Sequence, residues 1–95
     1  MLTVAQNPPR NVLIIGAGGF IGSNLASHFL AATDARVMLF DNLSRPGAGD
    51  NIAWLRTQGS SARLRFIRGD VRHSARVTEA CRTADEIYHC AARCG

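Results

Sequence analysis

The stretch that decides the fold is Asn11-Val12-Leu13-Ile14-Ile15-Gly16-Ala17-Gly18-Gly19-Phe20-Ile21-Gly22. After Asn11 it begins with an unbroken apolar run rich in β-branched residues, which predicts a strand buried on both faces, as in a parallel sheet. Glycines interrupt this run at once, and from Phe20 to Ala32 the apolar residues recur at helical spacing. The stretch therefore predicts a strand, a tight turn and a helix.

The same alternation continues along the chain. The sequence predicts strands at 36–41, 64–68 and 86–91, a loop over 42–50, a short helix around 52–55 ended by Gly59, and a helix at 75–84 capped by Ser74 or a neighbour. Residues 1–10, with Pro8-Pro9, are expected to be a flexible leader. The order β-α-β-α-β-α-β predicts an α/β fold with a Rossmann-type doubly wound parallel sheet over 11–95, with its C-terminal part absent.

The turn has the spacing Gly16-x-x-Gly19-x-x-Gly22 between the strand and the helix. Backbone N–H groups at a helix N-terminus, together with the helix dipole, favour a phosphate. Gly16 permits the sharp turn, Gly19 lets the backbone approach a pyrophosphate, and Gly22 lets the helix pack closely on the strand. A glycine-rich loop without function is the alternative, but the flanking strand and helix are the context that a dinucleotide site requires. We predict a pyrophosphate over residues 16–22.

Asp41 ends the second predicted strand, 19 residues after Gly22. This is close to the roughly 20-residue offset of the acid that binds the adenosine ribose in dinucleotide-binding folds. Its carboxylate would accept hydrogen bonds from both ribose hydroxyls and repel a 2′-phosphate, so the sequence predicts NAD rather than NADP. Arg45 leaves NADP open, because a guanidinium can bind a 2′-phosphate.

Composition narrows the class of protein. The 95 residues suffice for one small domain, and the contents of 46% hydrophobic and 19% charged residues are ordinary for a globular one. The net charge of +4 comes from eleven scattered arginines and no lysine, which favours a solvated surface over nucleic-acid binding.

The cysteines and the lack of targeting signals bear on the compartment. Cys81, Cys90 and Cys94 lack the spacing of a metal site, and their odd number suits a reducing compartment. Neither a signal peptide nor a membrane-spanning run is present, so we expect a cytoplasmic protein without membrane contact.

These segments together resemble the extended short-chain dehydrogenase/reductase family, in its NAD-dependent sugar-nucleotide epimerase/dehydratase branch. The likeness covers residues 11–92 and rests on five stretches, which are 11–25, 40–47, 51–55, 69–72 and 89–92. The Asp-Asn-Leu-Ser-Arg run at 41–45, followed by Asn-x-x-Trp-Leu at 51–55, is similar to the CDP-paratose 2-epimerase group.

The resemblance implies roles around the turn and after the second strand. Phe20 and Ile21 would contact the pyrophosphate through their backbones. Asn42, Ser44 and Arg45 would lie on the adenosine side of the cofactor, next to the ribose-binding acid.

Two further pairs receive roles from the resemblance. Asp70 would accept a hydrogen bond from the adenine amino group, with Val71 beside it. Ala91 and Ala92 would be the small residues after the fourth strand that let the cofactor lie flat, and large side chains there would fill the crevice at the strand ends.

The family's chemistry uses a Tyr-x-x-x-Lys pair with a Ser or Thr, in which the tyrosine transfers the hydroxyl proton. This chain has no lysine, and its single tyrosine, Tyr88, lies inside the fourth predicted strand. His28, His73 and His89 are interpreted as structural. We therefore predict no catalytic and no metal-binding residue in these 95 residues.

Three hypotheses of function remain open. The first is the NAD(H)-binding part of a sugar-nucleotide epimerase or dehydratase that acts by transient hydride transfer at a sugar carbon. A nucleotide-sugar substrate and a homodimer would belong to the full-length enzyme only. The second is a non-catalytic NAD-binding module or an inactive truncated product, and the third is a fragment of an NADP-linked reductase. The chain alone is expected to be catalytically inert and poorly folded, because half of a doubly wound sheet is absent.

Overall fold

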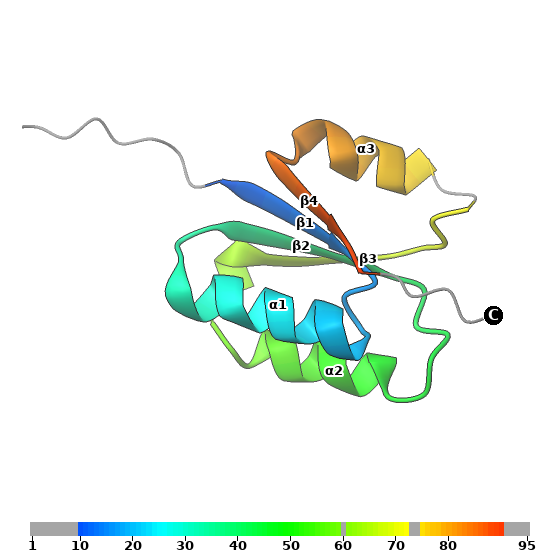
Figure 1. Ribbon diagram of the computed structural model, residues 1–95, viewed down its shortest axis with the longest axis horizontal. Helices are drawn as coiled ribbons and strands as arrows, with labels where there is room; N and C mark the ends of the chain where they lie inside the picture. Colours follow the sequence, from blue (N-terminus) through cyan, green and yellow to red (C-terminus); the bar gives the residue numbers. More distant parts are fainter. Residues whose placement is uncertain (1–9, 60, 73–74, 91–95) are drawn as a thin grey trace, which may run out of the picture.

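The computed structural model describes residues 10–59, 61–72 and 75–90. Four strands run parallel in one sheet, in the order β3-β2-β1-β4, with bounds β1 (Asn11–Ile15), β2 (Arg36–Asp41), β3 (Leu64–Arg68) and β4 (Glu86–His89). Helices α1 (Phe20–Ala32) and α2 (Ala48–Arg56) cover one face of the sheet, and α3 (Ala75–Thr83) covers the other (Figure 1). This arrangement confirms the predicted Rossmann-type α/β fold.

The core lies on both faces of the central strands, because side chains alternate along each strand. Val12, Ile14 and Leu39 face α1 and α2, whereas Leu13 and Phe40 face α3. All five side chains are almost completely buried, as the apolar runs at 12–15 and 37–40 predict for strands that are covered on both sides.

Several element boundaries differ from the prediction. Helix α2 begins at Ala48, inside the predicted loop 42–50, because Gly47 with φ of 84° turns the chain and Ala48 is buried at once. Residues 61–63 form an unpredicted short 3-10 helix before β3. Strand β4 ends at His89 rather than at residue 91. The predicted leader up to residue 9, the cap at Ser74 and residues 91–95 lie outside the described residues.

The predicted apolar stripe of α1 is only partly buried. Phe29 and Leu30 are buried in the core, but Phe20 is 81% exposed and Ile21 is 68% exposed. Both lie in the first turn of α1 and line a pocket at the end of the sheet. The helical spacing of the apolar residues therefore predicts the helix, but it does not show which of these side chains are buried in the core and which line the pocket.

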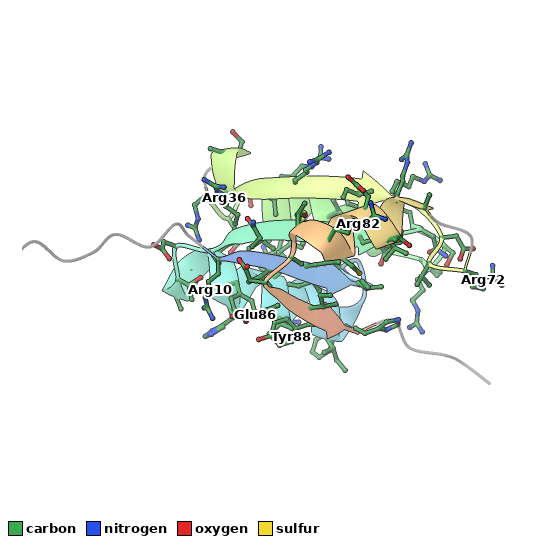
Figure 2. The ribbon with its side chains drawn as sticks, turned by 90° about the horizontal axis from the view of Figure 1, so that it is seen from above. Arg10, Arg36, Arg72, Arg82, Glu86 and Tyr88 are labelled. Carbon is green, nitrogen blue, oxygen red and sulfur yellow. The ribbon has the colours of Figure 1, made fainter. Side chains whose placement is uncertain are left out.

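Polar side chains attach β4 to the amino end of β1. Asp85 accepts a hydrogen bond from the Asn11 backbone at 2.7 Å, and Arg10 forms an ion pair with Glu86. The Tyr88 hydroxyl donates to Glu86 at 2.8 Å, and Figure 2 shows Arg10, Glu86 and Tyr88 along this edge of the molecule. Among the described residues, no helix is long and apolar enough to cross a membrane.

Candidate functional site

A pocket of about 300 Å³ lies at the carboxyl ends of the central strands. In open parallel α/β sheets, ligands bind at this edge, beside the topological switch point where the strand order changes direction. Here that point lies between β1 and β4. The pocket is lined by residues from β1, the glycine turn, α1, the ends of β2, β3 and β4, and the loops beyond: Ile15, Gly16, Gly19, Phe20, Ile21, Phe40, Asp41, Asn42, Ser44, Arg45, Gly69, Val71 and Cys90.

The turn after β1 is tight and is fixed by backbone hydrogen bonds. Gly16 has φ of 82°, in the left-handed region that favours glycine, as the sharp turn predicted at this position requires. The Gly16 N–H donates to the Phe40 carbonyl at 2.7 Å, and the Gly19 N–H donates to the Gly16 carbonyl at 3.1 Å. These bonds tie the turn to β2 and direct the chain into α1.

Gly22 lies where α1 passes closest to this turn. A Cβ atom at Gly22 would stand 2.3 Å from the Gly16 carbonyl oxygen and 2.9 Å from the Ala17 Cα, distances that real side chains do not tolerate. The predicted close packing is therefore present. In the structure, α1 makes this contact with the turn directly after β1. Gly19 differs, because a Cβ there would meet only the Gly16 oxygen, at 3.5 Å.

The first turn of α1 offers unpaired backbone donors. The first amide that bonds into the helix end is that of Ser23, whose N–H donates to the Gly19 carbonyl at 2.9 Å. The N–H groups of Phe20, Ile21 and Gly22 have no hydrogen-bond partner within 10–59, 61–72 and 75–90. Such donors at the positive end of a helix dipole are suited to the oxygens of a phosphate group.

Asp41 stands beside these donors at the end of β2. Its Oδ2 accepts a hydrogen bond from the Gly18 N–H at 2.9 Å, and its Oδ1 accepts one from the Leu43 N–H at 2.7 Å. Leu43 has φ of 60°, a conformation that is uncommon for a leucine, and it packs against the core. The two bonds fix the carboxylate at the pocket wall and leave lone pairs for a further donor.

Sequence reasoning missed the part played by Gly18. A Cβ at this position would approach the Ala48 Cβ to 2.8 Å and the Asp41 Oδ2 to 3.1 Å. The Gly18 carbonyl accepts a hydrogen bond from the Asn51 side chain at 2.7 Å. The Gly18-Gly19 pair was a signal in the sequence, but the partners on α2 are 30 or more residues away and only the folded chain brings them to the turn.

The structure brings most of the other predicted residues to the pocket. Asn42, Ser44, Arg45 and Val71 line it, as do the exposed side chains of α1's first turn. Asp70 does not line the pocket, and its carboxylate accepts hydrogen bonds from the side chain and backbone of Arg72. The predicted residues Ala91 and Ala92 lie outside the described residues. That this set binds a cofactor stays a prediction.

Four lining residues were not among the predicted contacts. Ile15, Phe40 and Gly69 lie at or directly after the ends of strands. Their place in the pocket follows from where each strand ends and not from the type of side chain, so the sequence did not indicate them. Cys90 follows β4 and donates its backbone N–H to the Ile15 carbonyl at 2.7 Å. Burial raises the pKa of the Cys90 thiol, so the neutral thiol prevails at neutral pH.

Known proteins share this sequence pattern. Residues 12–95 match the NAD dependent epimerase/dehydratase family. CDP-paratose 2-epimerase from Salmonella typhi is 46% identical over 67 residues, which are 70% of this chain and 19% of that protein. UDP-D-apiose/UDP-D-xylose synthase 1 from Arabidopsis thaliana is 33% identical over 93 residues, which are 90% of this chain and 22% of that protein. The chain therefore spans only a minor part of the length of these relatives.

Solved structures share the fold. UDP-glucuronic acid 4-epimerase from Bacillus cereus, in complex with NAD, matches with a TM-score of 0.74 and 32% identity over 90% of this chain and 28% of that one. The Bordetella bronchiseptica enzyme WbmG, in complex with NAD, has the same fold, with a TM-score of 0.72 and 24% identity over 97% of this chain and 28% of its own. Because the family match covers nearly the whole sequence, this chain belongs to the NAD-dependent epimerase/dehydratase family.

Proposed function

We propose that this chain binds NAD(H) in the pocket at the carboxyl end of its sheet. The observation that carries the proposal is the meeting of two groups there. Phe20 and Ile21, which carry unpaired N–H groups in the first turn of α1, line the same pocket as Asp41, whose carboxylate is fixed by hydrogen bonds. A dinucleotide needs both, because its pyrophosphate requires donors and its adenosine ribose requires an acceptor.

The residues that are present fit this cofactor. The lack of a side chain at Gly19 leaves the space over the turn open, and the backbone donors of Phe20 and Ile21, which line the pocket, would hold the pyrophosphate. Asp41 would accept from the ribose hydroxyls, with Asn42, Ser44, Arg45 and Val71 forming the adenosine side of the pocket. The solved NAD complex of the UDP-glucuronic acid 4-epimerase from Bacillus cereus supports the assignment of NAD.

We further propose that the protein acts on a nucleotide sugar. The names of several relatives support this, since they are described as CDP-paratose, UDP-sugar and dTDP-glucose enzymes. When bound, NAD would accept a hydride from a sugar carbon and return it, the chemistry that an epimerase or a dehydratase requires. In that reaction the residues of this chain would bind and orient the cofactor, while the proton would be transferred by residues outside the sequence described here, which has no lysine.

A glycine substitution tests the binding site with little effect on the fold. Gly19→Val puts a side chain where the pyrophosphate is proposed to lie, while its Cβ meets only the Gly16 oxygen at an ordinary contact distance. Because the chain alone is expected to be poorly folded, the unmodified chain and its variants are extended by the remaining strands of the sheet in this and the following NAD titrations. We expect calorimetric titration to show NAD binding to the extended unmodified chain and none to its Gly19→Val variant. Gly49→Val is the matched control, because a Cβ at Gly49 meets nothing within 4 Å and it should leave NAD affinity unchanged. Equal NAD affinity in the Gly19 variant and the unmodified chain would refute the proposed site.

A further inference from the structure

The side chain of Asn51 reaches from α2 to the glycine turn between β1 and α1. Its Nδ2 donates a hydrogen bond to the Gly18 carbonyl oxygen at 2.7 Å, across 33 residues of sequence. Asn51 is half-buried and is not one of the residues that line the pocket. Its effect on a bound ligand must therefore pass through the backbone of the turn.

This bond fixes one particular peptide plane. The carbonyl of the Gly18-Gly19 peptide is held by Asn51, and the N–H of the same peptide donates to the Gly16 carbonyl at 3.1 Å. Both residues are glycines, so no side chain restricts rotation of this plane, and the two hydrogen bonds supply the restraint. The unpaired N–H groups of Phe20 and Ile21 follow directly along the chain.

We propose that Asn51 is a positioning residue for the pyrophosphate cradle. It holds the Gly18-Gly19 peptide in the orientation from which the next N–H groups point into the pocket. The proposal rests on the proposed NAD binding and adds to it a determinant on α2 that does not touch the cofactor. Preorganised donors bind more tightly because the ligand does not have to order them on binding.

The chemistry of the contact requires an amide. An asparagine donates through its NH₂ group, whereas an aspartate of the same shape carries two acceptor oxygens and no donor when ionised. Asn51→Asp would therefore place a negative charge against the Gly18 carbonyl, which is itself an acceptor. This isosteric change keeps the volume of the side chain and removes the hydrogen bond, which separates bonding from packing.

The test compares four versions of the chain, which are the unmodified sequence, Asn51→Ala, Asn51→Asp and Gln58→Ala. Gln58, which follows α2, accepts a hydrogen bond from Ser27 of α1 at 3.2 Å. Gln58→Ala therefore removes a hydrogen bond between these two segments and leaves the glycine turn unchanged. Each version is melted to check that it is folded and is then titrated with NAD. A second titration uses adenosine, which lacks the pyrophosphate.

We expect NAD affinity to fall about tenfold in Asn51→Ala, because this variant loses one hydrogen bond and the ordering of the turn that the bond provides. NAD affinity should fall further in Asn51→Asp. Adenosine affinity should stay unchanged in both variants, and NAD affinity should stay unchanged in Gln58→Ala. The backbone amide signals of Phe20 and Ile21 in NMR spectra should shift in the two Asn51 variants and not in Gln58→Ala.

The outcomes separate this inference from the proposed function. If the unmodified chain does not bind NAD, the proposed function fails, and with it the inference. If the unmodified chain binds NAD and both Asn51 variants bind it equally well, the inference alone is overturned. An equal loss of adenosine affinity, or an equal loss of NAD affinity in Gln58→Ala, would show a general effect on α2 and would also overturn it. Should Asn51→Ala fail to fold, the isosteric Asn51→Asp decides.

Discussion

The carboxylate of Asp41 accepts a hydrogen bond from the backbone N–H of Gly18, with 2.9 Å between the two heavy atoms. This bond joins the end of β2 to the turn that follows β1, the two elements whose carboxyl ends form the pocket. The acid expected to bind the adenosine ribose is therefore also a support of the turn expected to bind the pyrophosphate. Any substitution of Asp41 acts on both.

Asp41→Asn tests the choice between NAD and NADP. The unmodified chain should bind NAD more tightly than NADP, because the carboxylate repels a 2′-phosphate. Asparagine removes the charge but keeps one oxygen that can accept from Gly18 or Leu43. We expect NAD affinity to fall by about tenfold, as for the loss of a charge-assisted hydrogen bond, and the preference for NAD over NADP to narrow. Parallel calorimetric titrations with the two cofactors measure this.

Asp41→Ala should behave differently from Asp41→Asn. It removes both acceptors, so the Gly18 and Leu43 N–H groups lose their partner and the turn loses order. We expect a lower melting temperature in Asp41→Ala than in Asp41→Asn.

The cofactor preference has its own contradicting outcome. If the unmodified chain binds NADP as tightly as NAD, Arg45 outweighs the acid and the prediction of cofactor choice is wrong.

Gly22→Ala should destabilise the chain. The added Cβ would lie 2.3 Å from the Gly16 carbonyl oxygen, which belongs to rigid backbone, so α1 would have to move away from the turn. We expect a loss of about 1–3 kcal/mol in the free energy of unfolding, as for overpacking of a close contact. Urea denaturation followed by circular dichroism measures it. Gly49→Ala, in open space on α2, should instead stabilise the chain by about 0.4–1 kcal/mol.

Local sequence patterns were sufficient to predict the order of the strands and α-helices of this chain, although several of their bounds differ from the prediction. The apolar run at 12–15 predicts β1, and the glycines that follow predict the turn, because both signals lie within a few neighbouring residues. The acid at the end of β2 was found by its spacing from the turn. These features depend on local backbone conformation and on a fixed offset, and both can be read from a single sequence.

The contacts that support the site were not predictable in the same way. Ala48 lies under Gly18 and Asn51 bonds to it only because α2 packs next to α1. Asn51 begins the Asn-x-x-Trp-Leu run that carries part of the family likeness, but nothing in the sequence shows that its side chain reaches the glycine turn. Similarly, Phe20 is exposed and lines the pocket, which helical spacing alone does not reveal.

Arg63 should contribute measurably to stability. Its guanidinium, from the 3-10 helix before β3, donates to the carbonyls of Phe29, Leu30, Thr33 and Ala35 at 2.6–3.3 Å. These carbonyls lie at the C-terminus of α1 and in the segment that leads into β2, where a positive charge is favoured by the helix dipole. We expect Arg63→Met to lower the free energy of unfolding by about 1–3 kcal/mol.

The control for Arg63 is Arg65→Met, which removes the same group from an exposed position on β3. Its effect should lie within about 0.5 kcal/mol of zero, as for most surface substitutions. Arg63→Lys should recover only part of the loss, because an ammonium group cannot reproduce the fork of a guanidinium. Equal urea midpoints for the Arg63 and Arg65 variants would contradict the assignment.

The ionisation of Tyr88 should depend on Glu86. The Tyr88 hydroxyl donates to Glu86, and this hydrogen bond, followed by burial and the negative charge of Glu86, raises the pKa of Tyr88. The positive charge of Arg10 opposes the shift. Because Tyr88 is the only tyrosine, the phenolate absorbance as a function of pH reports this one group. We expect it to ionise above the ordinary value for tyrosine, about 10.

Glu86→Gln should bring the pKa of Tyr88 back toward that ordinary value, while Glu79→Gln, an exposed carboxylate that pairs with Arg82, should leave it unchanged. The sign for stability follows from linkage, because the pKa is higher in the folded than in the unfolded chain. The stabilisation by this contact is therefore fully present below the unfolded pKa and is lost as the pH rises through the folded one. The difference in melting temperature between the unmodified chain and Glu86→Gln should accordingly become smaller at alkaline pH, where only the contribution of the ion pair between Glu86 and Arg10 is left. Identical phenolate titrations in the two proteins would show that the contact with Glu86 does not control Tyr88.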